Sequence, residues 1–485
     1  MHDQRTSRRG VLAIGGGAAA TLTLASCATL GGHGSSLANH TQELVRTMDL
    51  SGAVLLARGD QIEFAESYGL ADRASGRRNT VDTKLNLASI SKMFTAICIM
   101  QLVEAGVLSL GDTIARHLPR YPNHAAAENV TIAHLLMHRS GIGNYWEGLA
   151  DLKGPYPEDH RDYLPLFADI PLEHEPGSAF SYSNGGYIVL GLIIEAVTGK
   201  RYYDHVRHAV FDRSGMADTG NWSVAEEVSN RAVAYMRSEE NPGEWIDCSS
   251  RLEARGSAAG GAYSTVGDLH RFALALTRNR LLGPEMTRAF LQGRSDTPLG
   301  KYGYGIVEQN LNGTRLLGHS GGHYGVAGEL MIFPDSDTVF VVLTNGDVDG
   351  YWAVEACLHE KMAGPTDDTR NYRFTQELID KTVSKGIEAG LAASRRSGAA
   401  RKTREGVVDL AGFKYIHRGR NSEGIDLLQL NRMLHPKSDY AVYRLADGLR
   451  VTGQARAALD MYRAYLERVP GDAQAEAHMD RLSRK

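Results

Sequence analysis

Strand-like runs at both ends of a long helical stretch constrain the fold of this chain most. Gly52–Arg58 and Gln61–Tyr68 are rich in apolar residues, and the Gly-Asp pair between them is typical of a hairpin turn. Leu330–Phe333 and Val339–Thr344 have the same character, with a Pro-Asp-Ser-Asp turn between them. We therefore expect an α+β fold: both ends supply strands of one antiparallel sheet flanked by helices, and a helical lobe lies between them in the sequence.

The 485 residues are too many for one ordinary core, and the composition changes near residue 364. We expect one large domain over residues 38–363, which contains all of the strand-like runs. A charged amphipathic helix, Arg373–Arg395, and a basic linker follow within residues 364–404.

The remaining residues, 405–485, contain a repeated pattern, in which Gly419 and Gly453 stand 34 positions apart. This period resembles that of tetratricopeptide repeats, whose small residues let two helices approach and whose proline ends the second helix. We expect two units, at about 405–437 and 438–470, and a final capping helix. The repeats either fill a structural role or bind a protein partner.

The first 26 residues have the pattern of an export signal and are left out of fold reasoning. Ser7–Leu12 resembles a twin-arginine motif, and Leu24–Cys27, after an apolar run, resembles a bacterial lipobox. We expect Cys27 to carry lipid and to anchor an exported protein to a membrane, in the periplasm or at the cell surface. The alternative is an ordinary signal peptide cut nearby.

Composition narrows the function classes further. The formal net charge is −4, which gives no reason to expect a nucleic-acid partner. No apolar run after residue 26 approaches the 18 or so residues of a membrane span. The other cysteines are scattered and odd in number, so no disulfide framework is expected.

Ser89 and Lys92 open a run of apolar residues at helical spacing. Residues three apart on a helix share a face, so the hydroxyl and the ammonium would lie side by side. Burial favours the neutral amine, which can take a proton from the hydroxyl. Ser89 is therefore a candidate nucleophile with Lys92 as its base.

Two later segments supply what such a nucleophile needs. Tyr182 and Asn184 are two apart, so in an extended loop both point to one side. A cation near Tyr182 would lower its pKa and make the phenolate a usable base, while Asn184 could orient Lys92 and hold a substrate carbonyl. The second segment, residues 318–322, would place a titratable imidazole, a hydroxyl and bare backbone at a strand edge beside the site.

Taken together, Ser89-Ile90-Ser91-Lys92, Tyr182-Ser183-Asn184 and His319-Ser320-Gly321 resemble the three motifs of the serine β-lactamase and penicillin-binding-protein superfamily. Their order and spacing look most like class C β-lactamases and related D-aminopeptidases, carboxypeptidases and esterases, over about residues 38–363.

The resemblance implies an acyl-enzyme mechanism without a metal or cofactor, on a small-molecule or peptide substrate. Ser89 would attack, and Lys92 and Tyr182 would share the acid–base work. Backbone N–H groups of Ser89 and Gly322 would hold the oxyanion. The substrate-binding residues would be Asn184, His319, Ser320, Gly321 and Gly322.

One departure from the family pattern bears on the substrate. Lactamases usually carry lysine where this chain has His319, and that lysine helps to hold the β-lactam carboxylate. Histidine is neutral for much of the time near pH 7. Antibiotic hydrolysis is therefore in doubt, whereas ester and D-amino-acyl amide substrates remain open.

Three other interpretations of these motifs remain. Residues 318–322 also read Gly-x-Ser-x-Gly, an α/β-hydrolase elbow with Ser320 as nucleophile, if a helix follows. His134 and His138, four apart, could form a metal pair or, more simply, brace a loop. Finally, the chain could be a lipid-anchored scaffold of the same fold that has lost turnover.

Overall fold

The computed structural model describes residues 50–152, 156–346, 349–397 and 401–484. The expected export signal and Cys27 lie outside these residues. The chain divides into two compact units. Among the described residues, one comprises those of 51–234 and 247–346, and the other comprises Leu50, Tyr235–Ile246 and those of 349–484. Within the described residues, no helix is both long and apolar enough to cross a bilayer.

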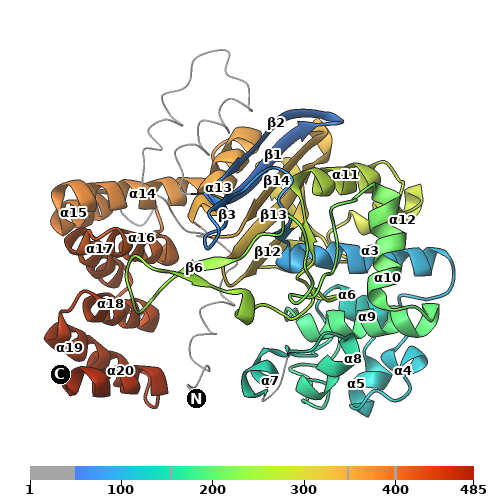
Figure 1. Cartoon of the computed structure of the whole chain (residues 1–485), viewed down its shortest axis with the longest axis horizontal. Coiled ribbons are helices and arrows are strands. Elements are labelled where there is room, and N and C mark those ends of the chain that lie inside the picture. Colours follow the sequence, from blue (N-terminus) through green and yellow to red (C-terminus); the bar gives the residue numbers. More distant parts are fainter. Residues whose placement is uncertain (1–49, 153–155, 347–348, 398–400, 485) are drawn as a thin grey trace. The chain divides into compact units, whose positions relative to one another are not determined.

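The first unit is built on an eight-stranded sheet in the order β2-β1-β14-β13-β12-β11-β10-β9. Figure 1 labels the strands from β2 to β12 in this order. Neighbouring strands pair antiparallel, and β1 pairs with β14 from Gly52↔Thr344 to Arg58↔Thr338. The two ends of this unit thus supply strands of one antiparallel sheet, as predicted, and two of these strands, β1 and β14, are neighbours. The strands are β1 (Gly52–Arg58), β2 (Gln61–Tyr68), β9 (Ser295–Thr297), β10 (Gly300–Tyr302), β11 (Val307–Leu311), β12 (Thr314–His323), β13 (Val326–Phe333) and β14 (Thr338–Thr344).

Short paired strands complete the β structure of this unit. Its small strands are β3 (Leu70–Asp72), β4 (Arg77–Arg78), β5 (Leu85–Asn86) and β8 (Tyr263–Ser264). The β5–β8 pair matters most for function, because it connects the stretch before Ser89 to a segment more than 170 residues later.

Helices form the lobe beside the sheet, and α3 and α9 lie at its centre. In α3 (Lys92–Glu104) every residue from Lys92 to Met100 is buried, and α9 (Asn184–Thr198) is buried from Asn184 to Ile194. Helices that are apolar on all sides must lie inside a core. Helix α11 (Val266–Thr277) packs on β14 and β1. The other helices are α4 (Ile114–His117), α5 (His124–Asn129), α6 (Ile132–Leu136), α7 (Trp146–Asp151), α8 (His160–Tyr163), α10 (Tyr202–Val206) and α12 (Pro284–Phe290).

The second unit is mainly helical, and one expected helix proves to be two. The sequence predicts a single helix over Arg373–Arg395, but α14 (Asp367–Lys385) ends where Gly386 takes a φ of +81°. Glycine adopts this backbone conformation without the steric penalty of a side chain, so it ends helices readily. Helix α15 (Ile387–Ser397) then begins. Helix α13 (Asp349–Ala363) precedes both.

Paired helices form the C-terminal tail. Gly424 approaches α16 so closely that a Cβ there would lie 2.6 Å from the carbonyl oxygen of Gly412. The small residues therefore let the first two helices pack, as the repeat pattern predicts. The tetratricopeptide identity itself stays a prediction. The helices are α16 (Glu405–His417), α17 (Asn421–Leu434), α18 (Asp439–Val451), α19 (Ala455–Leu466) and α20 (Ala473–Ser483).

A hairpin from the middle of the sequence belongs to the same unit as this tail. Its strands are β6 (Tyr235–Arg237) and β7 (Trp245–Asp247). Glu239 pairs with Arg444 at 3.2 Å, and Glu240 pairs with Arg450 at 2.6 Å. Arg444 and Arg450 of the tail thus form ion pairs with acidic residues of the same chain.

Candidate active site

Ser89 lies in a short 3₁₀ turn, Ala88–Ser91, between β5 and α3. The sequence predicted it on the helix itself. The side chains of Ser89 and Lys92 still lie close together, because residues three apart in a 3₁₀ turn are eclipsed. Ala88 has a left-handed φ of 42°, and its carbonyl accepts a hydrogen bond from the Gly261 N–H at 3.1 Å. The turn is thus anchored to the segment near β8, while Ser89 stays half-buried.

Lys92 is the first residue of α3, and its side chain is completely buried. Its Nζ lies 3.0 Å from Ser89 Oγ and 2.7 Å from Asn184 Oδ1, and it also donates to the carbonyl of Ala259. Burial lowers the pKa of Lys92 from 10.5 to about 7, and the charge of Glu253 offsets part of that effect. The amine therefore loses its proton near neutral pH.

Those three neighbours decide where the lone pair of a neutral amine lies. A neutral amine has two N–H groups, and Asn184 Oδ1 and the Ala259 carbonyl can only accept. The remaining position, occupied by the lone pair, faces the Ser89 hydroxyl, which can donate. The geometry can thus move a proton from Ser89 to Lys92.

Tyr182 lies just before α9, and its ring centroid is 4.9 Å from Lys92 Nζ. A hydrogen bond joins its hydroxyl to Ser89. We expected nearby cations to lower the pKa of Tyr182, and the structure indicates the opposite. Burial raises that pKa, and the hydrogen bond with Ser89 offsets only part of the rise. Tyr182 is therefore a neutral phenol at physiological pH.

His138 supports the ring of Tyr182, with centroids 4.0 Å apart and planes tilted by 30°. It lies beyond the end of α6, not on one helix face with His134, and its φ is 55°. The Ser183 N–H donates to His138 Nδ1 at 3.0 Å. His138 therefore braces the segment that carries Tyr182, which is the simpler of the two interpretations of this residue.

A buried chain of hydrogen bonds continues from His138 through Tyr302 to His319. His138 Nε2 lies 3.1 Å from the Tyr302 hydroxyl, which lies 2.9 Å from His319 Nε2. His319 Nδ1 lies 2.5 Å from the carbonyl of Ser320, so this nitrogen carries the proton. These hydrogen bonds can all form at once only if the Tyr302 hydroxyl donates to His319 and accepts from His138. Every donor then has an acceptor, with both rings neutral.

The charge of His319 follows from this environment. Burial, with the positive charge of Lys92, lowers its pKa from 6.5 to about 4. His319 is therefore neutral at pH 7, and its Nε2 is already engaged by Tyr302 rather than free to hold an anion.

Strand β12 carries His319, Ser320, Gly321 and Gly322, and it passes beside the nucleophile at Gly321. Its pairing with β11 ends at Gly318, so from His319 onward its register continues only with β13. A Cβ on Gly321 would lie 2.2 Å from the Leu87 carbonyl oxygen and 3.0 Å from Ser89 N. Only glycine allows this close approach, and Ser320 and Gly322 remain exposed on the opposite face.

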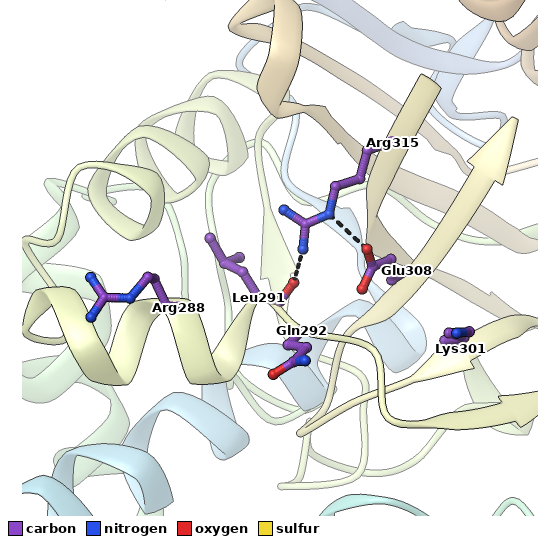
Figure 2. Close-up of a pocket in the computed structure, with 6 residues that line it drawn as sticks. All are labelled: Arg288, Leu291, Gln292, Lys301, Glu308 and Arg315. Carbon is purple, nitrogen blue, oxygen red and sulfur yellow. Dashed lines mark hydrogen bonds and ion pairs between the residues drawn. The ribbon is translucent and has the colours of Figure 1, made fainter. Parts of the chain in front are cut away.

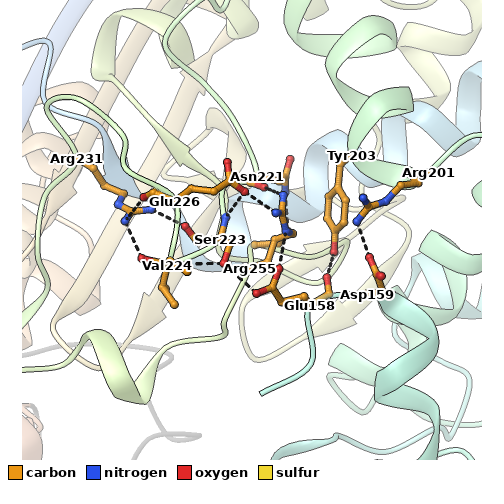
Figure 3. Close-up of polar contacts among 12 residues, drawn as sticks. Glu158, Asp159, Arg201, Tyr203, Asn221, Ser223, Val224, Glu226, Arg231 and Arg255 are labelled. Carbon is orange, nitrogen blue, oxygen red and sulfur yellow. Dashed lines mark hydrogen bonds and ion pairs between the residues drawn. The ribbon is translucent and has the colours of Figure 1, made fainter. Parts of the chain in front are cut away.

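An ion-pair network surrounds Arg255, four residues before Ala259 in the sequence (Figure 3). The Arg255 guanidinium donates to the carbonyl of Asn221 at 2.9 Å and lies 3.5 Å from a Glu158 carboxylate oxygen. The Asn221 amide in turn donates to the Gly256 carbonyl at 3.0 Å. These contacts fix the backbone at Arg255 and Gly256, shortly before the residue whose carbonyl accepts from Lys92.

Sequence reasoning missed Tyr302 and Glu253. Neither belongs to a recognisable motif, and an isolated tyrosine or glutamate carries no spacing signal. Both are placed by long-range contacts alone.

The competing interpretations do not match the structure. Ser320 lies within β12, which continues to His323 and is followed by β13, so the helix that a nucleophile elbow requires is not there. Thr131 is the N-cap of α6, and His134 completes its capping box by accepting a hydrogen bond from the Thr131 N–H. Among the described residues, no three histidine, cysteine or acidic side chains gather as a metal site would require.

A surface pocket of about 560 Å³ lies elsewhere in this unit (Figure 2). In it, Arg315 is paired with Glu308 at 2.7 Å and donates to the Leu291 carbonyl at 2.6 Å. The pocket shares no residue with the constellation around Ser89, so it is not the catalytic centre. Its lining residues are Arg288, Leu291, Gln292, Lys301, Glu308 and Arg315.

Comparison with known proteins agrees with this geometry. The family model described as Beta-lactamase matches residues 37–356. Penicillin-binding protein 4* of Bacillus subtilis is 29% identical over 329 residues, which cover 64% of this chain and 72% of the relative. Esterase EstB of Burkholderia gladioli is 34% identical over 215 residues, and the D-aminopeptidase of Brucella anthropi is 27% identical over 289. The match to the esterase covers 41% of this chain and 54% of the esterase. The match to the D-aminopeptidase covers 56% of this chain and 51% of that relative.

A solved structure extends the likeness to the fold. The penicillin-binding protein from Bacillus halodurans has a TM-score of 0.61 and 34% sequence identity. The match covers 67% of this chain and 99% of that protein.

Proposed function

The chain belongs to the beta-lactamase family of serine hydrolases, and from this premise we propose that it hydrolyses esters and D-amino-acyl amides through an acyl-enzyme on Ser89. The observation that carries the proposal is the environment of Lys92. Its amine contacts Ser89 Oγ at 3.0 Å, and its other two contacts are acceptors.

Acylation begins with proton transfer from Ser89 to Lys92. The Ser89 oxygen attacks the carbonyl carbon as its proton moves to the neutral amine. The ammonium so formed keeps three hydrogen bonds, to Ser89, Asn184 and Ala259. Backbone N–H groups of Ser89 and Gly322 stabilise the oxyanion that develops on the carbonyl oxygen.

Tyr182 completes the proton path to the leaving group. Its hydroxyl donates a proton to the departing oxygen or nitrogen and regains one from Lys92, so that the acyl-enzyme forms with a neutral amine. In the second half-reaction a water molecule attacks the acyl carbon. Its proton returns along the same path to Ser89, which leaves as a hydroxyl.

The neutral state of His319 supports the choice of substrate class. A lysine at this position would offer a cation to a substrate carboxylate, whereas His319 is neutral above about pH 4. Substrates that rely on a carboxylate anchor, including β-lactams, are therefore expected to be poor. Neutral esters and amides have no carboxylate for such a cation to bind, so histidine in place of lysine does not weaken their binding.

Hydrolysis of a p-nitrophenyl ester tests the proposal. We expect turnover that disappears in Ser89→Ala and survives in Ser320→Ala, and a fluorophosphonate probe that labels a peptide containing Ser89. Activity lost only in Ser320→Ala would overturn the assignment of the nucleophile. No adduct and no turnover on any ester or D-amide would favour the scaffold alternative.

We further propose that the protein is exported and lipid-anchored through Cys27, on the strength of its lipobox-like sequence. Incorporation of labelled palmitate that is lost in Cys27→Ser tests this. The C-terminal helices contact the chain's own hairpin through Arg444 and Arg450, so a protein partner that bound these two arginines would have to compete with the hairpin.

A further inference from the structure

A buried histidine outside the three motifs holds the turn that carries the Ala259 carbonyl. Residues 257–260 form a tight turn, whose first and last residues exchange backbone hydrogen bonds. His160 Nε2 accepts a hydrogen bond from the N–H of Ala258 at 2.9 Å, and the His160 side chain is completely buried. The imidazole therefore holds the backbone one residue before the carbonyl that accepts from Lys92.

The carbonyl of Ala258 is held as well. It accepts a hydrogen bond from the Thr95 hydroxyl at 2.8 Å, and Thr95 is three residues after Lys92 on α3. Both backbone polar groups of Ala258 are thus paired with buried side chains, of His160 and Thr95. With this residue fixed, the direction of the next carbonyl, that of Ala259, is fixed too.

The hydrogen bond from Ala258 also determines the tautomer of His160. A ring nitrogen that accepts from an N–H carries no proton, so the proton of the ring lies on Nδ1. That nitrogen lies 3.5 Å from Glu195 Oε1, which is long for a hydrogen bond but close enough for electrostatic attraction. Burial alone would raise the pKa of Glu195, but its contacts with His160 and the Tyr202 N–H hold that pKa below its usual value. Glu195 is therefore an anion that favours the required tautomer.

Helix α9 connects this pair to the other acceptor of Lys92. Asn184 is the first residue of α9 and accepts from Lys92 directly, whereas Glu195 lies near the end of the same helix. Gly191 lies between them, and a Cβ there would be 2.7 Å from His160 Cδ2. Only glycine lets the imidazole pack this closely on α9. One buried helix thus supports both acceptors of the amine.

We propose that His160, held by Glu195, is a positioning residue for the base Lys92. It acts through the Ala259 carbonyl and touches neither the substrate nor the reacting atoms. While this carbonyl is in place, both N–H groups of the neutral amine have fixed acceptors, and the lone pair faces Ser89. When it is released, the amine can rotate, and the ammonium form loses one of its three hydrogen bonds. The inference rests on the proposed hydrolase function and adds a residue that supports its base.

Two substitutions at position 160 provide the test in the full-length enzyme. His160→Phe keeps a ring against Tyr202 and Tyr203 but cannot accept from the Ala258 N–H. His160→Gln keeps an acceptor at about the position of Nε2. With a neutral ester, we expect His160→Phe to lower kcat by about tenfold or more and to leave KM nearly unchanged, since a hydrogen bond to a charged group is lost. His160→Gln should retain most of the activity, and equal losses in the two variants would overturn the inference.

The pH profile separates positioning from a general loss of stability. A carbonyl that accepts from the ammonium favours the protonated state of Lys92, so the pKa of Lys92 falls when this carbonyl is released. We expect the midpoint of kcat/KM against pH to fall by about one unit in His160→Phe and to stay at the wild-type value in His160→Gln. Reduced activity with an unchanged midpoint would overturn the inference, because the variant would then only contain less folded enzyme. A midpoint that rises would overturn it as well.

His270→Phe is the matched control. His270 is another buried imidazole of the same unit, and its Nε2 lies 2.8 Å from a backbone group, the Gly59 carbonyl in the β1–β2 turn. Its loss should leave the midpoint of the pH profile unchanged. Gly191→Ala reaches the His160 contact without altering position 160, and it keeps the inference testable if His160→Phe does not fold. It should lower the midpoint, and a wild-type profile in this variant would overturn the inference.

Titration of Lys92 by NMR separates this inference from the hydrolase function. In protein that contains isotopically labelled lysine, the Lys92 signal is identified by its absence in Lys92→Arg, and its pKa is measured without turnover. A pKa that falls in His160→Phe, with no turnover of any ester or amide by the wild type, would overturn the proposed function and leave the positioning role standing. Wild-type turnover with the same Lys92 pKa in both proteins would overturn the positioning role alone.

Discussion

Lys92 Nζ and Asn184 Oδ1 lie 2.7 Å apart, although α3 and α9 begin 92 residues from each other. The contact joins the first residues of two buried helices. It supplies one of the two acceptors that direct the lone pair of the amine toward Ser89. The whole proton-transfer geometry therefore depends on how two helices pack, as well as on the local Ser-x-x-Lys spacing.

The pH dependence of turnover should report the pKa of Lys92. Burial lowers this pKa from 10.5 to about 7, so the neutral amine becomes available as the pH rises through that value. We expect kcat/KM for a neutral ester to increase between pH 6 and 8 and then to level off. Lys92→Arg should abolish the activity, because its guanidinium stays protonated. A profile that is flat over this range would contradict the role of Lys92.

Tyr182→Phe should reduce kcat strongly while leaving the protein folded. The phenyl ring can still stack on His138, but the hydroxyl that passes the proton is lost. General acid–base groups contribute about 100-fold or more, so we expect a loss of that size, measured by steady-state kinetics. Tyr163→Phe is the control, because the buried Tyr163 hydroxyl makes no hydrogen bond within the described residues. Equal effects of the two substitutions would contradict the assignment.

Removal of the Tyr302 hydroxyl should destabilise the protein. It leaves His138 Nε2 and His319 Nε2 without partners, and an unpaired buried polar group costs about 1–3 kcal/mol. We expect Tyr302→Phe to lower the free energy of unfolding by about 2 kcal/mol or more. Urea denaturation measures this. In a double-mutant cycle with His319→Phe, the two losses should not add, and strict additivity would disprove the hydrogen-bonded chain.

Acid should destabilise the first unit before its carboxylates titrate. His319 has a pKa of about 4 in the folded protein against 6.5 as the ordinary value. Between these values the unfolded chain binds the proton and the folded protein does not, so stability falls as the pH decreases from about 6.5 to 4. The loss from this residue is about 3 kcal/mol over that window. Unfolding curves at several pH values should show it, with a smaller slope in His319→Gln.

Gly321→Ala should inactivate the enzyme by displacing backbone rather than by removing a functional group. The new Cβ would lie 2.2 Å from the Leu87 carbonyl oxygen, and backbone atoms on both sides cannot rotate away. We expect a loss in kcat/KM of about 100-fold or more, comparable to removing an oxyanion donor. Gly111→Ala, where the nearest atom is 3.9 Å away, should behave as wild type. Full activity in Gly321→Ala would refute the close approach of β12 to Ser89.

Some features could be predicted because their causes are local in the chain. The β1–β2 and β13–β14 hairpins follow from apolar runs and turn residues that lie next to each other. The Ser89–Lys92 contact follows from a spacing of three, which brings side chains together in both α and 3₁₀ geometry. A glycine inside a helical pattern can either continue the helix or end it. At Gly386 it ends the helix, so the prediction of one continuous helix was wrong.

The protonation states around the nucleophile could not be read in the same way. The pKa of Tyr182 was expected to fall because a lysine lies near it, and burial raises it instead. His138, Tyr302 and His319 form one hydrogen-bonded chain, although no spacing connects them. Glu253 influences the charge of Lys92, although 161 positions separate the two residues in the sequence.

The amino-acid sequence by itself determined the strands, the buried helices and the residue types available for chemistry, because periodicity and turn preference act over a few neighbouring residues. Only the tertiary structure decided which of those groups are charged, which way each proton points and which residues share the site. Burial and electrostatic interaction depend on distance in space, and that distance is set by how remote segments pack.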